Sequence, residues 1–265
     1  MDSVREFFMR LIINNKLKDN NKLIKLIYKI SETDETFSRD KFINNISFLE
    51  KEINQIKYKI EIVTINKNSE KVIILFPGKC DCYFSYELIE KISEIFNITV
   101  VTFNYPGYQM SEPNLKNETN FYNAGKIVVD HFREKHSDIF LIGICLGTSV
   151  VVDYLYNNLD FKCQALLVCL IESLPKLCTG KIDIDISHFM IGHHFDNRKK
   201  LPYLNQEIHV LHCIEDDFLT VEQSKEMYEL INSEKTITFF NGTGHDFTVK
   251  NWDVGFELLK EKMNK

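Results

Sequence analysis

From residue 57 onward, short apolar runs alternate with segments of helical periodicity, and this alternation restricts the fold more than any other feature of the chain. The runs Val72–Phe76, Ile139–Ile142 and Ala165–Val168 are almost entirely apolar. Such runs are typical of parallel strands that are covered on both faces. Strands separated by helical patterns indicate βαβ units. The sequence therefore predicts an α/β fold with a doubly wound, mostly parallel sheet.

The expected elements divide the chain into an extension and a main domain. Residues 1–55 are expected to form an N-terminal helical extension packed on the core, because apolar residues recur there at helical spacing, as in Val4, Phe7 and Leu11. Residues 56–265 form the main domain, in which residues 172–206 lack periodicity and are predicted to form a small cap. Strands are expected over about 58–65, 72–76, 98–104, 139–143, 164–171, 208–213 and 235–240, and helices over about 84–96, 120–135, 146–158, 221–232 and 250–263.

Composition excludes several classes of protein. The formal net charge of −6 gives no basic face, so we expect no nucleic-acid partner. No apolar run approaches the roughly 18 residues of a membrane span, and the charged start of the chain does not resemble a secretory signal. Seven cysteines, an odd number, indicate free thiols in a cytoplasmic protein. Membrane-surface contact through Phe7 and Phe8 is an alternative role for the extension, although its polar face is not clearly cationic.

The strongest local signal is the segment Gly143-Ile-Cys-Leu-Gly147, which stands between an expected strand and an expected helix. This is the context of a nucleophile elbow, with Cys145 in place of serine. Small residues at 143 and 147 let the helix pack close to the strand, and the helix N-terminus favours a thiolate. The alternative is that Cys145 is a structural thiol, as Cys163 and Cys169 are expected to be.

Two residues from later strands complete a predicted catalytic triad. Asp216 follows the expected strand 208–213, and His245 stands in a glycine-rich turn after the expected strand 235–240. The chain order of nucleophile, acid and histidine is that of serine-type α/β sites, and the carboxyl ends of strands are where such sites form. We therefore predict Cys145 as nucleophile, His245 as base and Asp216 as the acid that orients the histidine.

Neighbouring carboxylates offer alternatives for the acid. Glu215 and Asp217 flank Asp216, which is preferred because of its position in the loop. Asp246, beside His245, is expected to cap its own loop.

An oxyanion hole requires two backbone N–H groups aimed at the developing negative charge. Leu146, directly after the proposed nucleophile, is expected to supply one, and Lys79, in the loop after the expected strand 72–76, the other. Gly78 permits close approach of that loop. The remaining residues expected to contact substrate are Cys80, Tyr105, His193 and His194.

Two groups of potential metal ligands are present in the sequence. Cys80 and Cys82 are separated by one residue, which is poor spacing for zinc. The histidines at 188, 193 and 194 with Asp196 form a richer cluster, but an irregular polar segment is more often a solvated loop. We predict neither a metal nor a cofactor.

From about residue 57 to the C-terminus, the chain resembles the α/β-hydrolase superfamily. Phe76-Pro-Gly followed by Asn104-Tyr-Pro-Gly-Tyr is similar to lipases, esterases and acyl-protein thioesterases. The Gly-Ile-Cys-Leu-Gly segment, with Glu-Asp-Asp-Phe and Gly-His-Asp-Phe, is similar to dienelactone hydrolases, whose triad is Cys–His–Asp. Cysteine also replaces serine in polyester synthases and some amino-acid N-acyltransferases of the superfamily. The chain departs from the usual pattern at Pro77, where histidine is common, and at Gln109, where glycine is common.

The resemblance and the residues together imply a hydrolase of acyl esters or thioesters that acts through a thioester acyl-enzyme. A cysteine paired with histidine forms a thiolate readily, and amines and thiols attack a thioester more readily, relative to water, than they attack an oxygen ester. An acyltransferase to an amine or thiol acceptor is therefore the first alternative. A non-catalytic binding protein with the same fold is the second. The expected partner is a small-molecule or acyl-carrier substrate.

Overall fold

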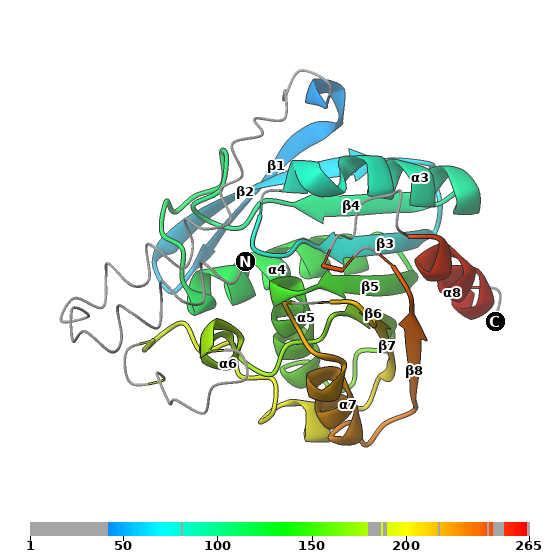
Figure 1. The fold of residues 1–265 in the computed structure, drawn as a ribbon. Helices are drawn as coiled ribbons and strands as arrows, with labels where there is room; N and C mark the ends of the chain where they lie inside the picture. The colour runs from blue at the N-terminus through cyan, green and yellow to red at the C-terminus, as the bar shows by residue number, and fades with distance from the viewer. Residues whose placement is uncertain are drawn as a thin grey trace.

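A computed structural model describes residues 42–80, 82–179, 187, 190–216, 218–242, 244–245 and 252–263. Its centre is a single eight-stranded sheet in the order β1-β2-β4-β3-β5-β6-β7-β8 (Figure 1). The strands are β1 (Ile46–Ile53), β2 (Ile56–Ile65), β3 (Lys71–Phe76), β4 (Thr99–Phe103), β5 (Asp138–Ile144), β6 (Gln164–Val168), β7 (Glu207–Cys213) and β8 (Lys235–Phe240). The α-helices are α3 (Tyr86–Phe96), α4 (Glu118–Arg133), α5 (Leu146–Tyr156), α6 (Leu174–Thr179), α7 (Val221–Glu229) and α8 (Asp253–Met263).

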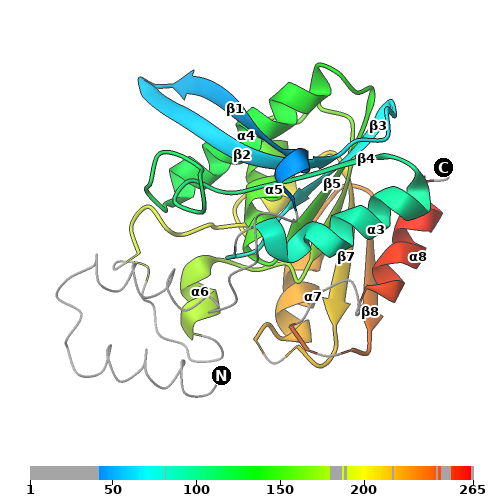
Figure 2. The same ribbon diagram turned by 90° about the horizontal axis from the view of Figure 1, so that it is seen from above.

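In the order of the sheet, the strands β4, β3, β5, β6, β7 and β8 run parallel to one another, whereas β2 pairs with β4 in the antiparallel sense. The chain crosses from β3 to β4 in one direction along the sheet and from β4 through β5 to β6 in the other. Because such crossovers are right-handed, α3 lies on one face of the sheet and α4, α5 and α7 lie on the other. Figure 2 shows α8 beside α3 on its face. The predicted doubly wound, mostly parallel sheet is thus confirmed.

The central strands consist of apolar residues because both of their faces are covered. All five residues of β4 are buried, and in β3, β5 and β6 every residue after the first is buried. The helices turn apolar stripes to this layer, and the fully buried rings of Phe76, Phe103 and Phe121 fill the space beneath them. Burial of these side chains is the main stabilising contribution to the fold.

The predicted N-terminal helical extension is wrong from residue 46 onward. Residues 46–53 form β1, which pairs with β2 through a two-residue turn at Asn54 and Gln55, both with positive φ. Positive φ at both central residues is the property of a tight hairpin turn. Ile46, Leu49 and Ile53 are the half-buried members of this edge strand, and their spacing of three and four imitates a helix. Residues 1–41, with Phe7 and Phe8, lie outside the described residues.

Parts of the predicted cap segment, 172–206, can be described. It begins with the short helix α6 and ends with a 3₁₀ helix over Leu201–Tyr203, which leads into β7. Residues 180–186, 188 and 189 lie outside the described part. Among the helices that the structure describes, none combines the length and the apolar character needed to cross a bilayer.

Candidate active site

Cys145 occupies the sharp turn between β5 and α5. Its backbone has φ 50° and ψ −113°, a conformation that costs energy for a residue with a side chain and that often occurs at functional sites. The carbonyl oxygen of Cys145 accepts hydrogen bonds from the N–H of Thr148 at 3.0 Å and from its hydroxyl at 2.6 Å. The first N–H groups of a helix point to its N-terminal end. The turn therefore places Cys145 directly at the N-terminus of α5.

Two glycines make this turn possible by admitting neighbouring backbone. A Cβ at Gly147 would lie 2.2 Å from the carbonyl oxygen of Phe76, and a Cβ at Gly143 would lie 2.8 Å from Cα of Thr148. Both distances are too short for real atoms. The Gly-x-Cys-x-Gly spacing thus lets α5 start directly against β3 and β5.

The loop after β3 lies beside the Cys145 side chain. A Cβ built at Gly78 would be 3.6 Å from Cβ of Cys145, so the backbone of this loop comes close to the thiol. Tyr105 supports this loop, because its hydroxyl donates to the carbonyl oxygen of Pro77 at 3.2 Å. Tyr105 itself is fully buried and stacks on Phe121 with ring centroids 4.3 Å apart.

Asp216, just beyond the end of β7, has a side chain that is fully buried and accepts four hydrogen bonds. Oδ1 accepts the backbone N–H groups of Phe218 and Leu219, each at 2.8 Å. Oδ2 accepts Nδ1 of His245 at 2.6 Å and the thiol of Cys169 at 3.1 Å. Burial alone would raise the pKa of Asp216, but the hydrogen bond and charge of His245, with the other donors, hold it below its ordinary value of 3.8. The carboxylate is therefore the stable form.

His245 bridges Asp216 and Cys145. Its ring hydrogen-bonds to Asp216 through Nδ1 at 2.6 Å, and the side chains of Cys145 and Cys169 are near enough to act on its charge. Burial acts to lower the pKa of His245, but the interaction with Cys145 and the hydrogen bond to Asp216 outweigh it and raise the pKa well above its ordinary value. The imidazole is thus oriented by the carboxylate of Asp216 and coupled to the thiol of Cys145 at the carboxyl edge of the sheet.

Comparisons with known proteins agree on the architecture. No model of a protein family matches the chain. A protein of Acanthamoeba polyphaga mimivirus that is named as an α/β-hydrolase is 24% identical over 187 residues, which are 68% of this chain and 69% of that protein. A bromoperoxidase structure from Bacillus anthracis has a TM-score of 0.64 at 13% identity and covers 83% of this chain and 100% of its own. The chain has the α/β-hydrolase fold.

Other solved structures of the hydrolase fold resemble the chain to a similar degree. An esterase from Exiguobacterium antarcticum has a TM-score of 0.62 at 14% identity, covering 78% of this chain and 96% of its own. Est1E from Butyrivibrio proteoclasticus, solved with ferulic acid, has a TM-score of 0.63 at 14% identity, covering 81% and 97%. Identities this low establish the fold and leave the chemistry to be argued from the site.

The alternatives considered for the acid differ in their contacts. Glu215 is exposed, and its carboxylate accepts the N–H of Gly242 at 2.9 Å. The contact with His245 belongs instead to Asp216. Asp217 and Asp246 lie outside the described residues.

Lys79 lies in the loop beside Cys145. The side chain is half-buried, and burial lowers its pKa, while the neighbouring thiols of Cys178, Cys145 and Cys80 act in the opposite direction. Its ammonium group therefore belongs to the immediate surroundings of the Cys145 thiol. Cys80 is half-buried on the same loop.

Tyr105 is fully buried, and its hydroxyl supports the loop at Pro77; its predicted contact with substrate stays a prediction. His194 is half-buried; its N–H donates to Glu118, at the start of α4, at 2.8 Å, and its ring Nε2 lies 3.1 Å from the carbonyl oxygen of Ser187. His193 is half-buried in the same segment, where burial lowers its pKa. Their predicted contact with substrate stays a prediction.

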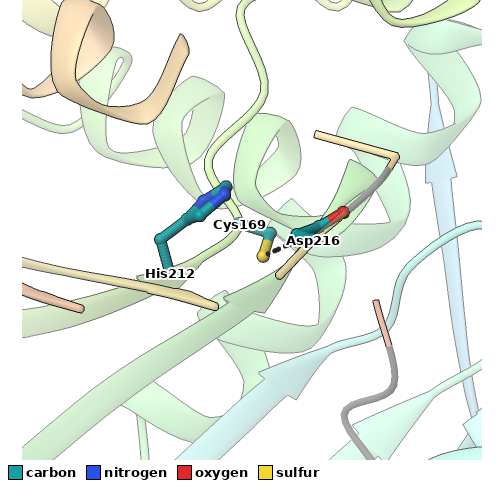
Figure 3. A group of neighbouring side chains, drawn as sticks. All are labelled: Cys169, His212 and Asp216. Atoms are coloured by element: carbon teal, nitrogen blue, oxygen red, sulfur yellow. Dashed lines mark hydrogen bonds between the residues drawn. The ribbon is translucent and has the colours of Figure 1, made fainter. Parts of the chain in front are cut away.

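Two side chains near Asp216 were missed by sequence reasoning. Cys169, at the end of β6, points toward Asp216, and His212 of β7 lies next to both (Figure 3). Burial lowers the pKa of His212, which favours the neutral ring. Its Nδ1 lies 2.6 Å from the Ser224 hydroxyl and its Nε2 3.1 Å from the carbonyl oxygen of Leu219. Neither residue stands in a motif; both meet the site through strand register.

The same three residues are the group of potential metal ligands found among the described residues. Ligand atoms of Cys169, His212 and Asp216 lie within 4.8 Å of one another. Both ring nitrogens of His212 have hydrogen-bonding partners, and Asp216 accepts four hydrogen bonds. A metal would have to replace these bonds, so the cluster supports the site through hydrogen bonding. His188, from the other predicted cluster, lies outside the described residues.

A second buried carboxylate joins the segments that follow β3 and β4. Glu61 of β2 is fully buried and accepts the hydroxyl of Tyr83 at 2.6 Å, the side-chain amide of Asn104 at 3.1 Å and the N–H of Met110 at 3.1 Å. Asn104 in turn accepts the N–H of Cys82 at 2.8 Å. The segment after the Gly78 loop and the segment after β4 therefore converge on one side chain.

Proposed function

We propose that the protein hydrolyses acyl esters or thioesters with a Cys145–His245–Asp216 triad. The observation that carries this proposal is the imidazole of His245, which is hydrogen-bonded to the buried carboxylate of Asp216 at 2.6 Å and lies near enough to the Cys145 thiol to interact with it. A nucleophile within reach of a base that a third group orients is the general signature of covalent catalysis. The esterase from Exiguobacterium antarcticum, which shares the fold, agrees with this class of reaction.

The proposed reaction begins with transfer of the Cys145 proton to His245. With Nδ1 of His245 donating to Asp216, Nε2 is the nitrogen that serves the thiol. The sulfur attacks the acyl carbon, and the carbonyl oxygen becomes an oxyanion. His245 then protonates the leaving alcohol or thiol, which departs and leaves a thioester on Cys145. Water, deprotonated by His245, attacks the thioester, releasing the acid and restoring the thiol.

The proposed oxyanion hole consists of the N–H groups of Leu146 and Lys79. Leu146 is the first residue of α5, where N–H groups lack helical acceptors. The backbone at Gly78, next to Lys79, lies against the Cys145 side chain. Two such donors near a developing negative charge stabilise it in the transition state. The Lys79 ammonium group adds positive charge to the same region.

Hydrolysis of a panel of p-nitrophenyl esters and aryl thioesters by wild type, Cys145→Ala and Cys145→Ser tests the proposal. We expect Cys145→Ala to lose at least about 10³-fold in kcat/KM. Intact-mass spectrometry of the wild type should show one acyl adduct during turnover, and peptide mapping should locate it on Cys145. A Cys145→Ala protein that is folded and fully active would show that the triad is not used.

The alternatives give different results in the same assay. If the protein is an acyltransferase, an added amine or thiol acceptor diverts the acyl group into an amide or a new thioester at the expense of the free acid. If it is a non-catalytic binding protein, no ester is turned over and no adduct forms on Cys145.

A further inference from the structure

We propose that Cys145 and Cys169 are a redox pair, in which a hydroperoxide oxidises Cys145 and Cys169 closes a disulfide with it. The inference rests on the placement of the two thiols and goes beyond acyl chemistry. It requires a reactive Cys145 but no acyl substrate.

The two cysteines occupy matching positions on neighbouring strands. Ile144 of β5 is paired with Val168 of β6, and each cysteine is the next residue. The N–H of Cys145 donates to the carbonyl oxygen of Val168 at 2.9 Å, which is the last bond of that pairing, whereas the N–H of Cys169 donates to Leu211 of β7 at 2.9 Å. Neighbouring strands lie about 5 Å apart, and disulfides join Cα atoms that are about 4.4–6.8 Å apart. Because both cysteines directly follow a paired couple, their backbones start from about the separation that a disulfide spans.

Both cysteines also turn in the same unusual way. Each has φ 50°, in the left-handed region that residues with side chains rarely adopt. Both side chains also lie near the same ring, that of His245, and the Cys169 thiol donates to the oxygen of Asp216 that accepts Nδ1 of that ring. Rotation about the Cα–Cβ bonds would have to turn the Cys169 sulfur from Asp216 toward Cys145 to close a disulfide.

The exposure of the two thiols assigns their roles. Cys145 is 6% exposed and lies in the turn after β5, whereas Cys169 is fully buried, with its thiol hydrogen-bonded to Asp216 (Figure 3). A small peroxide therefore meets Cys145 first. Burial raises the pKa of Cys169 to about 12, so this thiol stays protonated until the neighbouring sulfur has been oxidised.

The proposed steps balance with one equivalent of hydroperoxide. The Cys145 thiolate attacks the O–O bond, forms a sulfenic acid and releases an alkoxide or hydroxide, which takes the proton of the His245 imidazolium. Cys169 then passes its proton to His245 and attacks the sulfur of the sulfenic acid. The S–O bond breaks, the departing hydroxide takes that proton to give water, and the Cys145–Cys169 disulfide remains. The two thiols are oxidised by two electrons, and the peroxide is reduced.

Hydrogen peroxide treatment of the full chain followed by intact-mass spectrometry tests the pair without any substrate. We expect wild type to lose about 2 Da, which corresponds to two hydrogen atoms, and to regain them with dithiothreitol. In Cys169→Ser the same treatment should add about 32 Da on Cys145 as sulfinic acid, which dithiothreitol does not remove. The matched control is Cys163→Ser, which should behave like wild type.

Non-reducing tryptic maps decide which thiols are joined. Trypsin leaves Cys163 and Cys169 on one peptide, because it cleaves after Lys162 and no Lys or Arg lies between the two cysteines. The Cys163→Ser variant therefore assigns the bond to Cys169 directly. A disulfide from Cys145 to Cys80 or Cys178, or oxidation of wild-type Cys145 to sulfinic acid with no disulfide, would overturn the inference. Because no step uses an ester, this result is independent of the outcome of the hydrolysis assays.

Discussion

The two edges of the sheet carry similar residue types in different settings. At the carboxyl edge, Cys145, Asp216 and His245 follow the ends of β5, β7 and β8. At the amino edge there is a hollow of about 310 Å³. Its lining also combines a thiol, carboxylates and bases: Lys71, Val72, Asp138, Ile139, Phe140, Cys163, Gln164, Glu207, Lys262 and Met263.

The difference between the edges lies in backbone shape and burial. The ion pair at the amino edge joins Lys71 and Asp138 at 3.1 Å, with side chains that are 46% and 56% exposed. At the carboxyl edge the Asp216 side chain is fully buried, and its partner His245 is 23% exposed. A buried pair is not screened by water, and the turn at Cys145 places a thiol beside it. Residue type alone therefore does not distinguish a reactive edge from an inert one.

The largest contrast is expected between Asp216→Asn and Asp138→Asn. Asparagine at 216 cannot hold His245 in the tautomer that serves Cys145, so kcat should fall by about 10²–10⁴-fold. Asparagine at 138 removes an exposed ion pair worth about 0–1 kcal/mol and should leave kcat unchanged. Steady-state kinetics with a p-nitrophenyl ester measures both. Equal losses in the two variants would contradict the proposed division between the edges.

Gly147→Ala should destabilise the carboxyl edge by about 1–3 kcal/mol. The added Cβ would lie 2.2 Å from the carbonyl oxygen of Phe76, and backbone cannot move aside cheaply. Gly242→Ala is the control, because its Cβ would meet the side-chain ring of Phe240 at 3.0 Å, and a side chain can shift. Urea unfolding of both variants gives the comparison. The interpretation fails if Gly242→Ala costs as much as Gly147→Ala.

Iodoacetamide should modify Cys145 at least about 10-fold faster than Cys163 at pH 7.5. Cys145 lies at a helix N-terminus near the ring of His245, whereas burial raises the pKa of Cys163 to about 12. Time-resolved peptide mapping measures the two rates in one sample. His245→Ala should reduce the difference by slowing Cys145 alone. Preferential labelling of Cys163 or Cys169 would contradict the assignment of the nucleophile.

The smallest expected effect is the acid dependence of stability. The pKa of Asp216 lies below its ordinary value of 3.8 in the folded protein, so its stabilising contribution is complete above about pH 5 and is lost as the pH falls through the lowered value. Wild type should exceed Asp216→Asn by about 1–3 kcal/mol near pH 6, and the gap should close below pH 3.8. Urea unfolding across this range checks the direction. A gap that widens in acid would show that the carboxylate is not the stabilising form.

Much of the sheet could be predicted because buried parallel strands leave a strong pattern in the sequence. The residues of β3, β5 and β6 are apolar without alternation, and the elements that follow them have helical periodicity. The turn at Cys145 could be located because Gly143 and Gly147 are local requirements, each imposed by nearby backbone. The hydrogen bond between Asp216 and His245 agrees with the predicted chain order. The strands and the turn could be predicted because burial and nearby backbone restrict which residue types each short segment can contain.

The features that sequence reasoning missed depend on contacts between distant segments. β1 is a partly exposed edge strand, so its apolar spacing carries little information. Cys169 and His212 reach Asp216 only because β6 and β7 are in a particular register, which no local pattern specifies. Tyr105 stands in a motif similar to those of lipases, yet its ring is turned into the core beneath Pro77. A motif locates a residue along the chain, whereas tertiary packing decides which way it faces.

The buried carboxylate of Glu61 has a consequence for engineering this protein. Donors to it come from Tyr83, Asn104 and Met110, which belong to the segments that follow β3 and β4. Exchanging either segment alone for that of another enzyme would remove part of the hydrogen bonds to the buried Glu61 side chain, at a cost of several kcal/mol. The two segments and residue 61 should therefore be exchanged together, and libraries that diversify substrate preference should vary them jointly.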